Sequence, residues 1–200
     1  HLCAIAHAGM DAIMMDMGRA TDDPIACSLA NDTIRRAAAR GIDVYCFSSF
    51  TNLWHPDDPG ARERYASLQG RLFELCPGLK GIIFVGEACE FPSRDPRTTG
   101  RGWRESLGDD KPSPGWFPCD DYPAFMTLMR DVVRERRPDA DIVFWSYNWG
   151  YLDAGLRLKL IDRLPSDITL MATFEMFETV EVAPGITVTT TDYSLWRTDA

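Results

Sequence analysis

The chain repeats a cycle in which a segment with the apolar spacing of a helix is followed by a short, almost continuous apolar run. The apolar runs cover residues 11–17, 42–48, 81–86, 141–147 and 168–174. Each run has the length of a strand and lacks the apolar–polar alternation of a strand with one face in water. We therefore expect five parallel strands covered by helices, which is an α/β fold.

The segments between these runs carry the start and stop signals of helices. Gly9 is expected to close a first helix, Asn31 or Asp32 to cap a second one, and Asp58 with Pro59 to open a third. Two further helices follow from the same signals. The five expected helices cover residues 2–8, 31–40, 58–76, 120–137 and 152–164.

This order of elements fits a closed barrel or an open doubly wound sheet, and the connections favour the barrel. No glycine-rich phosphate turn follows any expected strand. The connections from helix to strand are short, whereas those from strand to helix are long and carry aromatic and acidic residues. This asymmetry is typical of a barrel with its site at the carboxyl ends of the strands.

We therefore predict a parallel (β/α) barrel of the TIM type that is incomplete. A full barrel has eight strands and about 250 residues, so we expect residues 1–200 to form a single partial barrel domain with five or six of the strands. Residues 176–200 leave this cycle, because no helix separates the β-rich run 186–194 from the strand before it. That run is either part of a hairpin or a sixth strand.

Composition narrows the possible partners. The chain is 45% hydrophobic and 26% charged, with a net charge of -9 and a pI of about 4.8. Nucleic acid is an unexpected partner, because Lys and Arg are not clustered. No apolar run reaches the roughly 20 residues that span a bilayer, so we expect a soluble protein that does not bind membranes. The sequence does not determine the oligomeric state. It does not determine the cellular location either, although the cytoplasm is favoured.

The six cysteines do not predict a metal site. They form no C-x-x-C pair and have no histidines at ligand spacing, so we expect no zinc site and interpret most of them as small core residues. Cys89 and Cys119 bracket the long segment 88–119 and could close it with a disulfide, although a core of this size does not require one.

The residues just past the strands are the candidates for chemistry. In a parallel barrel these positions face the catalytic bowl, and Glu87 and Glu175 each follow an apolar strand. Two carboxylates placed in this way fit the cleavage of a glycosidic bond, in which one protonates the leaving oxygen and the other acts as base or nucleophile. Either glutamate could instead cap a turn or pair with an arginine.

Aromatic and amide side chains near the same positions favour a sugar as the ligand, because flat rings stack on the apolar face of a pyranose. The expected substrate-binding residues are Asp16, Trp54, His55, Tyr147, Asn148 and Trp149. For Asp16 a capping or ion-pair role is an alternative, for His55 a surface role, and for Asn148 a turn.

Three segments resemble barrel glycoside hydrolases of the β-N-acetylhexosaminidase and α-glucuronidase type: GIIFVGEACEF at residues 81–91, FWSYNWGY at 144–151 and ITLMATFEMFE at 168–178. In those families the glutamate after the fourth strand is the general acid, so the resemblance implies this role for Glu87. The α-glucuronidase pattern implies that Glu175 is the base. Gly86 stands where the hexosaminidases have an aspartate, so the resemblance does not extend to catalysis assisted by a substrate acetamide.

The sequence thus predicts a glycosidase that needs no cofactor or metal and acts on a carbohydrate, with Glu87 as acid and Glu175 as base or nucleophile. One alternative is a carbohydrate-binding barrel without catalysis. Another is a metal-dependent barrel hydrolase or lyase that uses Asp16, His55 and the two glutamates as ligands.

Overall fold

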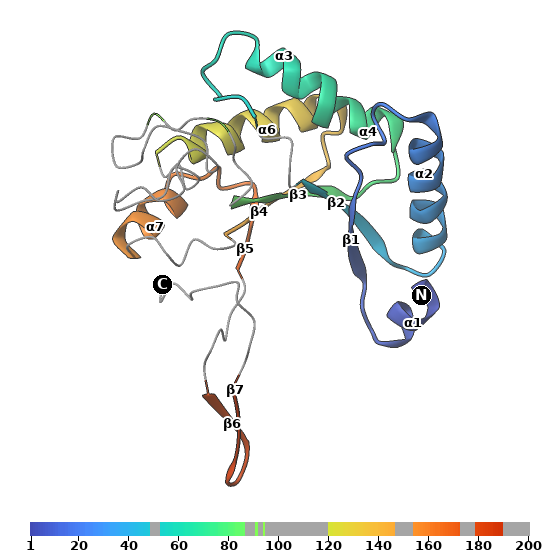
Figure 1. Cartoon of the computed structure of the whole chain (residues 1–200), viewed down its shortest axis with the longest axis vertical. Helices are drawn as coiled ribbons and strands as arrows, with labels where there is room; N and C mark the ends of the chain where they lie inside the picture. Colours follow the sequence, from blue (N-terminus) through green and yellow to red (C-terminus); the bar gives the residue numbers. More distant parts are fainter. Residues whose placement is uncertain are drawn as a thin grey trace.

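The computed structural model describes residues 1–48, 53–86, 91, 94, 120–146, 154–172 and 179–189. Within these ranges five strands form one parallel sheet in the order β1-β2-β3-β4-β5, so each strand pairs with the next along the chain (Figure 1). An open doubly wound sheet would reverse its order at a switch point. The sequential order confirms the prediction of a partial TIM-type barrel. The strands are β1 (Ala12–Asp16), β2 (Asp43–Ser48), β3 (Gly81–Val85), β4 (Asp141–Trp145) and β5 (Thr169–Met171).

The helices occupy the expected segments but differ at their ends. They are α1 (Leu2–His7), α2 (Pro24–Ala38), α3 (Ala61–Tyr65), the π-helical turn η1 (Ala66–Gly70), α4 (Arg71–Leu75), α6 (Tyr122–Arg136) and α7 (Ala154–Ile161). The elements α3, η1 and α4 follow one another without a break, as one helical segment.

The prediction that Asn31 or Asp32 caps the second helix is wrong. Asp23 caps α2 by accepting hydrogen bonds from the backbone N–H groups of Ile25 (2.9 Å) and Ala26 (3.3 Å), and Pro24 takes the first helical position. Asn31 lies inside α2, where its amide donates to the carbonyl of Leu75 at 2.9 Å. The predicted start at Asp58 and Pro59 also differs, because α3 begins at Ala61 after Gly60, whose φ is 75°.

The helical layer packs on one face of the sheet, and Phe125 of α6 lies at the centre of this contact. Its ring lies 5.9 Å from Phe84 of β3, 5.7 Å from Tyr65 of α3 and 5.5 Å from Phe91, measured between centroids. All four side chains are fully buried. Figure 1 shows α3, α4 and α6 together on this side. The strand residues that contact the helices are therefore the alternate, outward ones.

The remaining strand residues line the opposite, inner face. The pairing places Tyr45, Gly81 and Asp141 side by side, and the Tyr45 hydroxyl donates to Asp141 at 2.8 Å across the glycine. Burial, followed by this carboxylate, raises the pKa of Tyr45, so its hydroxyl stays a proton donor. Further along the strands, Phe47, Val85 and Trp145 form an apolar group on this face.

The β-rich stretch near the end of the chain is a hairpin, which confirms the first of the two interpretations left open. Strands β6 (Thr179–Ala183) and β7 (Ile186–Thr189) pair antiparallel around Gly185, whose φ is 75°. The hairpin extends away from the parallel sheet (Figure 1). It adds no strand to the barrel.

A buried histidine connects the segment before α3 to the start of α6. His55 is 3% exposed, and its Nε2 donates to the Asp121 carboxylate at 2.9 Å. Its Nδ1 accepts from the backbone N–H of Asp57 at 3.1 Å. Asp121 also accepts from the backbone N–H of Arg94 at 3.1 Å. Asp121 therefore holds two segments that are distant in the sequence.

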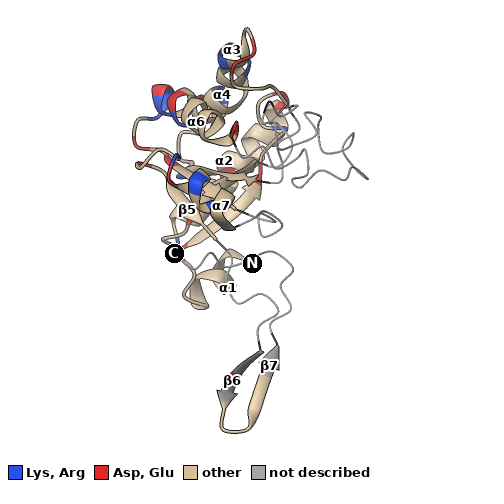
Figure 2. Ribbon diagram, turned by 90° about the vertical axis from the view of Figure 1, so that its left-hand side faces the viewer, with Lys and Arg blue, Asp and Glu red and all other residues tan. Residues whose placement is uncertain are grey.

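Charged side chains of both signs alternate over the helical layer (Figure 2). Arg130 and Arg134 of α6 both pair with Asp167, and Arg136 pairs with Glu74 at 3.1 Å. These groups are partly exposed, so each pair adds little stability. No helix in the described ranges is long and apolar enough to cross a membrane.

Replacing Gly81 by alanine should destabilise the fold. A Cβ atom there would lie 2.3 Å from the carbonyl oxygen of Asp141 and 2.9 Å from Cε1 of Tyr45. Overpacking of this kind costs about 1–3 kcal/mol. Gly70→Ala is the matched control, because the added Cβ would meet ordinary contacts of 3.4 Å and longer within a helix. Urea denaturation should show a clear loss of unfolding free energy for Gly81→Ala alone, and equal values for both variants would contradict this packing.

Replacing Asp121 by alanine should also lower stability, because the buried Nε2–H of His55 would lose its acceptor. We expect a loss of about 1–3 kcal/mol. Asp120→Ala is the control, since Asp120 makes an exposed pair with Arg163 at 2.7 Å whose removal should change stability by less than about 1 kcal/mol. Thermal unfolding of the two variants measures these two losses of stability. The loss cannot come from helix capping, because Asp121 makes no side-chain cap bond to α6.

Candidate functional site

The carboxyl ends of the strands combine an inner face and a cavity beside it. On the inner face, Asp16 ends β1 next to Phe47 of β2, and Trp145 ends β4 with its ring centroid 6.4 Å from that of Phe47. This edge therefore offers one carboxylate beside two aromatic rings. A carboxylate next to flat apolar rings suits a ligand with both hydroxyl groups and an apolar face.

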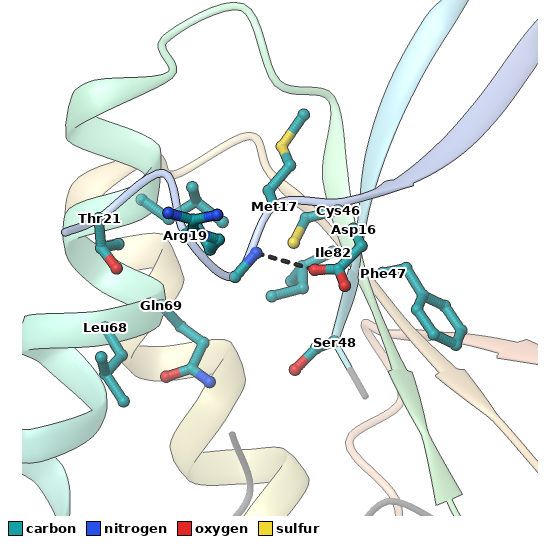
Figure 3. A pocket seen from close by; sticks show the side chains of 12 residues that line it. Asp16, Met17, Arg19, Thr21, Cys46, Phe47, Ser48, Leu68, Gln69 and Ile82 are labelled. Carbon is teal, nitrogen blue, oxygen red and sulfur yellow. Dashed lines mark hydrogen bonds between the residues drawn. The ribbon is translucent and has the colours of Figure 1, made fainter. Parts of the chain in front are cut away.

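The loop after β1 fixes the orientation of Asp16. Its carboxylate accepts a hydrogen bond from the backbone N–H of Gly18 at 2.9 Å (Figure 3). The side chain is thus turned back over its own loop and stays exposed to solvent. Asp16 was one of the expected substrate-binding residues; the structure places it at the carboxyl end of β1, and its role in binding stays a prediction.

The cavity lies between the ends of β1 and β2 and the helical segment that contains η1, and it has a volume of about 270 Å³. Its walls come from strands, from the loop after β1 and from the helix (Figure 3). The lining residues are Asp16, Met17, Gly18, Arg19, Thr21, Cys46, Phe47, Ser48, Leu68, Gln69, Leu72 and Ile82.

Cys46 is the one cysteine in the wall of this cavity, and it is not a nucleophile. Burial raises the pKa of its thiol to about 12, and the negative charge of Asp16 contributes in the same direction. A nucleophilic cysteine needs a thiolate near neutral pH. Cys46 is therefore a small core residue, as expected from the sequence.

Trp54 and His55 lie elsewhere. The Trp54 ring packs edge-on against Tyr65 of α3 with a centroid distance of 5.4 Å, and the guanidinium of Arg64 lies 5.3 Å from the ring centre. His55 is held by Asp121. Neither residue lines the cavity that contains Asp16. The structure thus does not bring Asp16, Trp54 and His55 together, and substrate binding by Trp54 and His55 stays a prediction.

The other expected site residues lie outside the described part of the chain. These are the two glutamates, Glu87 and Glu175, and the substrate-binding candidates Tyr147, Asn148 and Trp149. Cys89 and Cys119, with the disulfide considered for them, also lie outside it. Among the described residues, no group of three or more His, Cys, Asp or Glu side chains is arranged to hold a metal ion.

Sequence reasoning missed a buried polar residue of the cavity, Gln69. It is the only glutamine of the chain and is 4% exposed. The signal was present, because the buried positions Ala61, Tyr65, Gln69 and Leu72 follow helical spacing. A glutamine in such a row is a buried polar group that needs an explanation.

No model of a known protein family matches the chain, and no curated protein matches it significantly in sequence. Solved structures do match in fold. A β-glycosidase aligns over 86% of this chain with 12% identity and a TM-score of 0.54, and an O-GlcNAc hydrolase of Thermobaculum terrenum over 84% with 13% identity and a TM-score of 0.58. An endoglucanase of Pseudomonas stutzeri aligns over 86% with 18% identity and a TM-score of 0.52.

The aligned part corresponds to 53%, 36% and 50% of these three proteins, so the chain spans about half of their length or less. At identities of 12–18% the similarity establishes the fold and leaves the chemistry open. The chain therefore has the fold of part of a TIM-type barrel, the architecture predicted from its sequence.

Proposed function

We propose that the protein is a glycoside hydrolase in which Glu87 is the general acid and Glu175 is the base or nucleophile. The observation that carries this proposal is the direction of the strand residues before them. Val85 lies on the inner face, and so does Met171, which pairs with the inward Trp145. Glu87 follows Val85 by two positions and Glu175 follows Met171 by four. In a parallel barrel, the residues that follow the carboxyl ends of the strands face the catalytic bowl.

The spacing of the strands supports the pairing of these glutamates. Only β4 separates β3 from β5, so the two strands run about 10 Å apart, which is twice the usual distance between neighbours. Carboxyl groups on flexible side chains at that separation can approach to the ~5 Å of retaining enzymes or stay at the ~6.5–9.5 Å of inverting ones. Glycoside hydrolases among the structures with the same fold agree with the proposal.

In the proposed mechanism, Glu87 donates a proton to the glycosidic oxygen as its bond to the anomeric carbon breaks. Glu175 removes a proton from the attacking water, or attacks the anomeric carbon itself and is released by water in a second step. Phe47 and Trp145 offer an apolar wall beside the reacting ring, and Asp16 offers an acceptor for hydroxyl groups at the rim.

Glu87→Gln should reduce hydrolysis by about 10²- to 10⁴-fold, the usual contribution of a positioned general acid. The loss should be larger for a disaccharide than for a dinitrophenyl glycoside, because a good leaving group needs little protonation. Glu175→Gln should reduce both reactions. Initial rates with a panel of aryl glycosides and disaccharides measure these effects.

Glu63→Gln, an exposed glutamate of α3, is the control and should keep full activity. Equal losses of Glu87→Gln on both kinds of substrate would contradict the acid role. Sugar binding without hydrolysis by the unmodified protein would favour a binding barrel. Activity that a chelator removes would favour the metal-dependent alternative.

A further inference from the structure

The cavity beside the inner face has two buried polar side chains on opposite walls. Ser48 at the end of β2 is 5% exposed, and Gln69 of η1 is 4% exposed. Both point into the same space from the sheet and from the helix, with Asp16 above Ser48 (Figure 3). Three hydrogen-bonding groups of different kinds, a hydroxyl, an amide and a carboxylate, thus border one cavity.

Gln69 lies within the π-helical turn that forms part of this wall. A π-turn inserts one residue into a helix and re-aims the side chains around it, and such turns are frequent at functional sites. Here the turn covers Ala66–Gly70 between α3 and α4. It leaves Leu68 partly exposed and Gln69 buried, although the leucine is the more favourable residue for a core. Packing alone does not explain this choice.

Arg19 and Thr21 also line the cavity, and most of the remaining wall is apolar. Met17, Leu68, Leu72 and Ile82 line it. A volume of about 270 Å³ lies just below the roughly 300–1,000 Å³ of pockets for drug-sized ligands. A single six-membered ring with hydroxyl groups on its edge and an apolar face has the chemistry that these walls can contact.

We propose that this cavity binds one monosaccharide unit of the substrate, whose hydroxyl groups hydrogen-bond to Gln69, Ser48 and Asp16. This inference rests on the proposed function, since it takes the ligand of the cavity to be a unit of the proposed carbohydrate substrate. Gln69 and Ser48 also have interactions within the chain. A primary amide can make four hydrogen bonds and a hydroxyl three, so both have capacity for a ligand.

Each group has a distinct part in this subsite. The Gln69 amide both donates and accepts, which matches a sugar hydroxyl that does the same. The Asp16 carboxylate accepts only, and its bond from Gly18 keeps it oriented before the ligand arrives. A charged acceptor contributes more than a neutral one, so Asp16 should matter more for affinity than Gln69.

Direct binding to the Glu87→Gln protein, in which hydrolysis should be strongly reduced, tests the inference. Gln69→Met in that background keeps the size of the side chain and removes the amide, and it should weaken binding of the preferred monosaccharide by about three- to tenfold. Asp16→Asn should weaken it by about ten- to a hundredfold. Dissociation constants come from chemical-shift titrations with free monosaccharides, and melting curves establish that each variant is folded.

Ser67→Ala is the matched control, because Ser67 lies on the same π-turn with its hydroxyl bonded to the carbonyl of Arg64 at 2.7 Å and does not line the cavity. Its affinity should be unchanged. If Gln69→Met does not fold, the sugar affinity of Asp16→Asn tests the inference instead. Asp16 is exposed, so its replacement should leave the fold intact. Unchanged affinity in Gln69→Met and Asp16→Asn, or no binding of any monosaccharide, would overturn the inference.

The same proteins separate this inference from the proposed function. Hydrolysis by the unmodified protein together with unchanged sugar affinity in Gln69→Met and Asp16→Asn would overturn the subsite and leave the glycosidase standing. Loss of affinity in both variants, with no hydrolysis by the unmodified protein, would support a sugar site in this cavity and remove the catalytic role of the glutamates.

Discussion

The packing of alternate strand residues against α6 is the contact on which the rest of the structure depends. Phe84 of β3 and Phe144 of β4 point outward and meet Phe125 and Tyr122, with ring centroids 5.9 Å and 4.8 Å apart. All four rings are fully buried. Burial of large aromatic side chains is a major source of stability. Because strand residues alternate, fixing these positions outward directs their neighbours to the inner face.

The inner face is divided along the strands into a part that stabilises and a part open to chemistry. At the amino ends of the strands, Tyr45 reaches over Gly81 to Asp141 and joins three strands through one hydrogen bond. At the carboxyl ends of the strands lie Asp16, Phe47 and Trp145, and the first of these is exposed. Barrel enzymes show the same division between a stabilising face and a catalytic one.

Much of this architecture was predictable because it depends on local sequence. The apolar runs identified all five parallel strands, and the contrast between short and long connections predicted the barrel order. The start of α2 was misplaced because Asn31 has the chemistry of a cap, while its actual partner is the carbonyl of Leu75, 44 residues away. The same limit applies to His55, whose burial depends on Asp121, 66 residues further along the chain. A single sequence does not reveal such distant partners.

Asp16 borders both the proposed subsite and the inner face of the sheet. By alternation its side chain belongs to the inner face with Phe47, yet the bond from Gly18 turns its carboxylate over the loop that borders the cavity. Cys46 and Ser48 point outward on the neighbouring strand, so the cavity is reached beside the sheet rather than through its centre. A sugar ring bound in this cavity would lie next to the carboxyl ends of the strands, where the inner face of the sheet begins. A carboxylate at the end of β1 is therefore the one described acidic group in the wall of the cavity that could contact both a sugar held beside the sheet and one held over it.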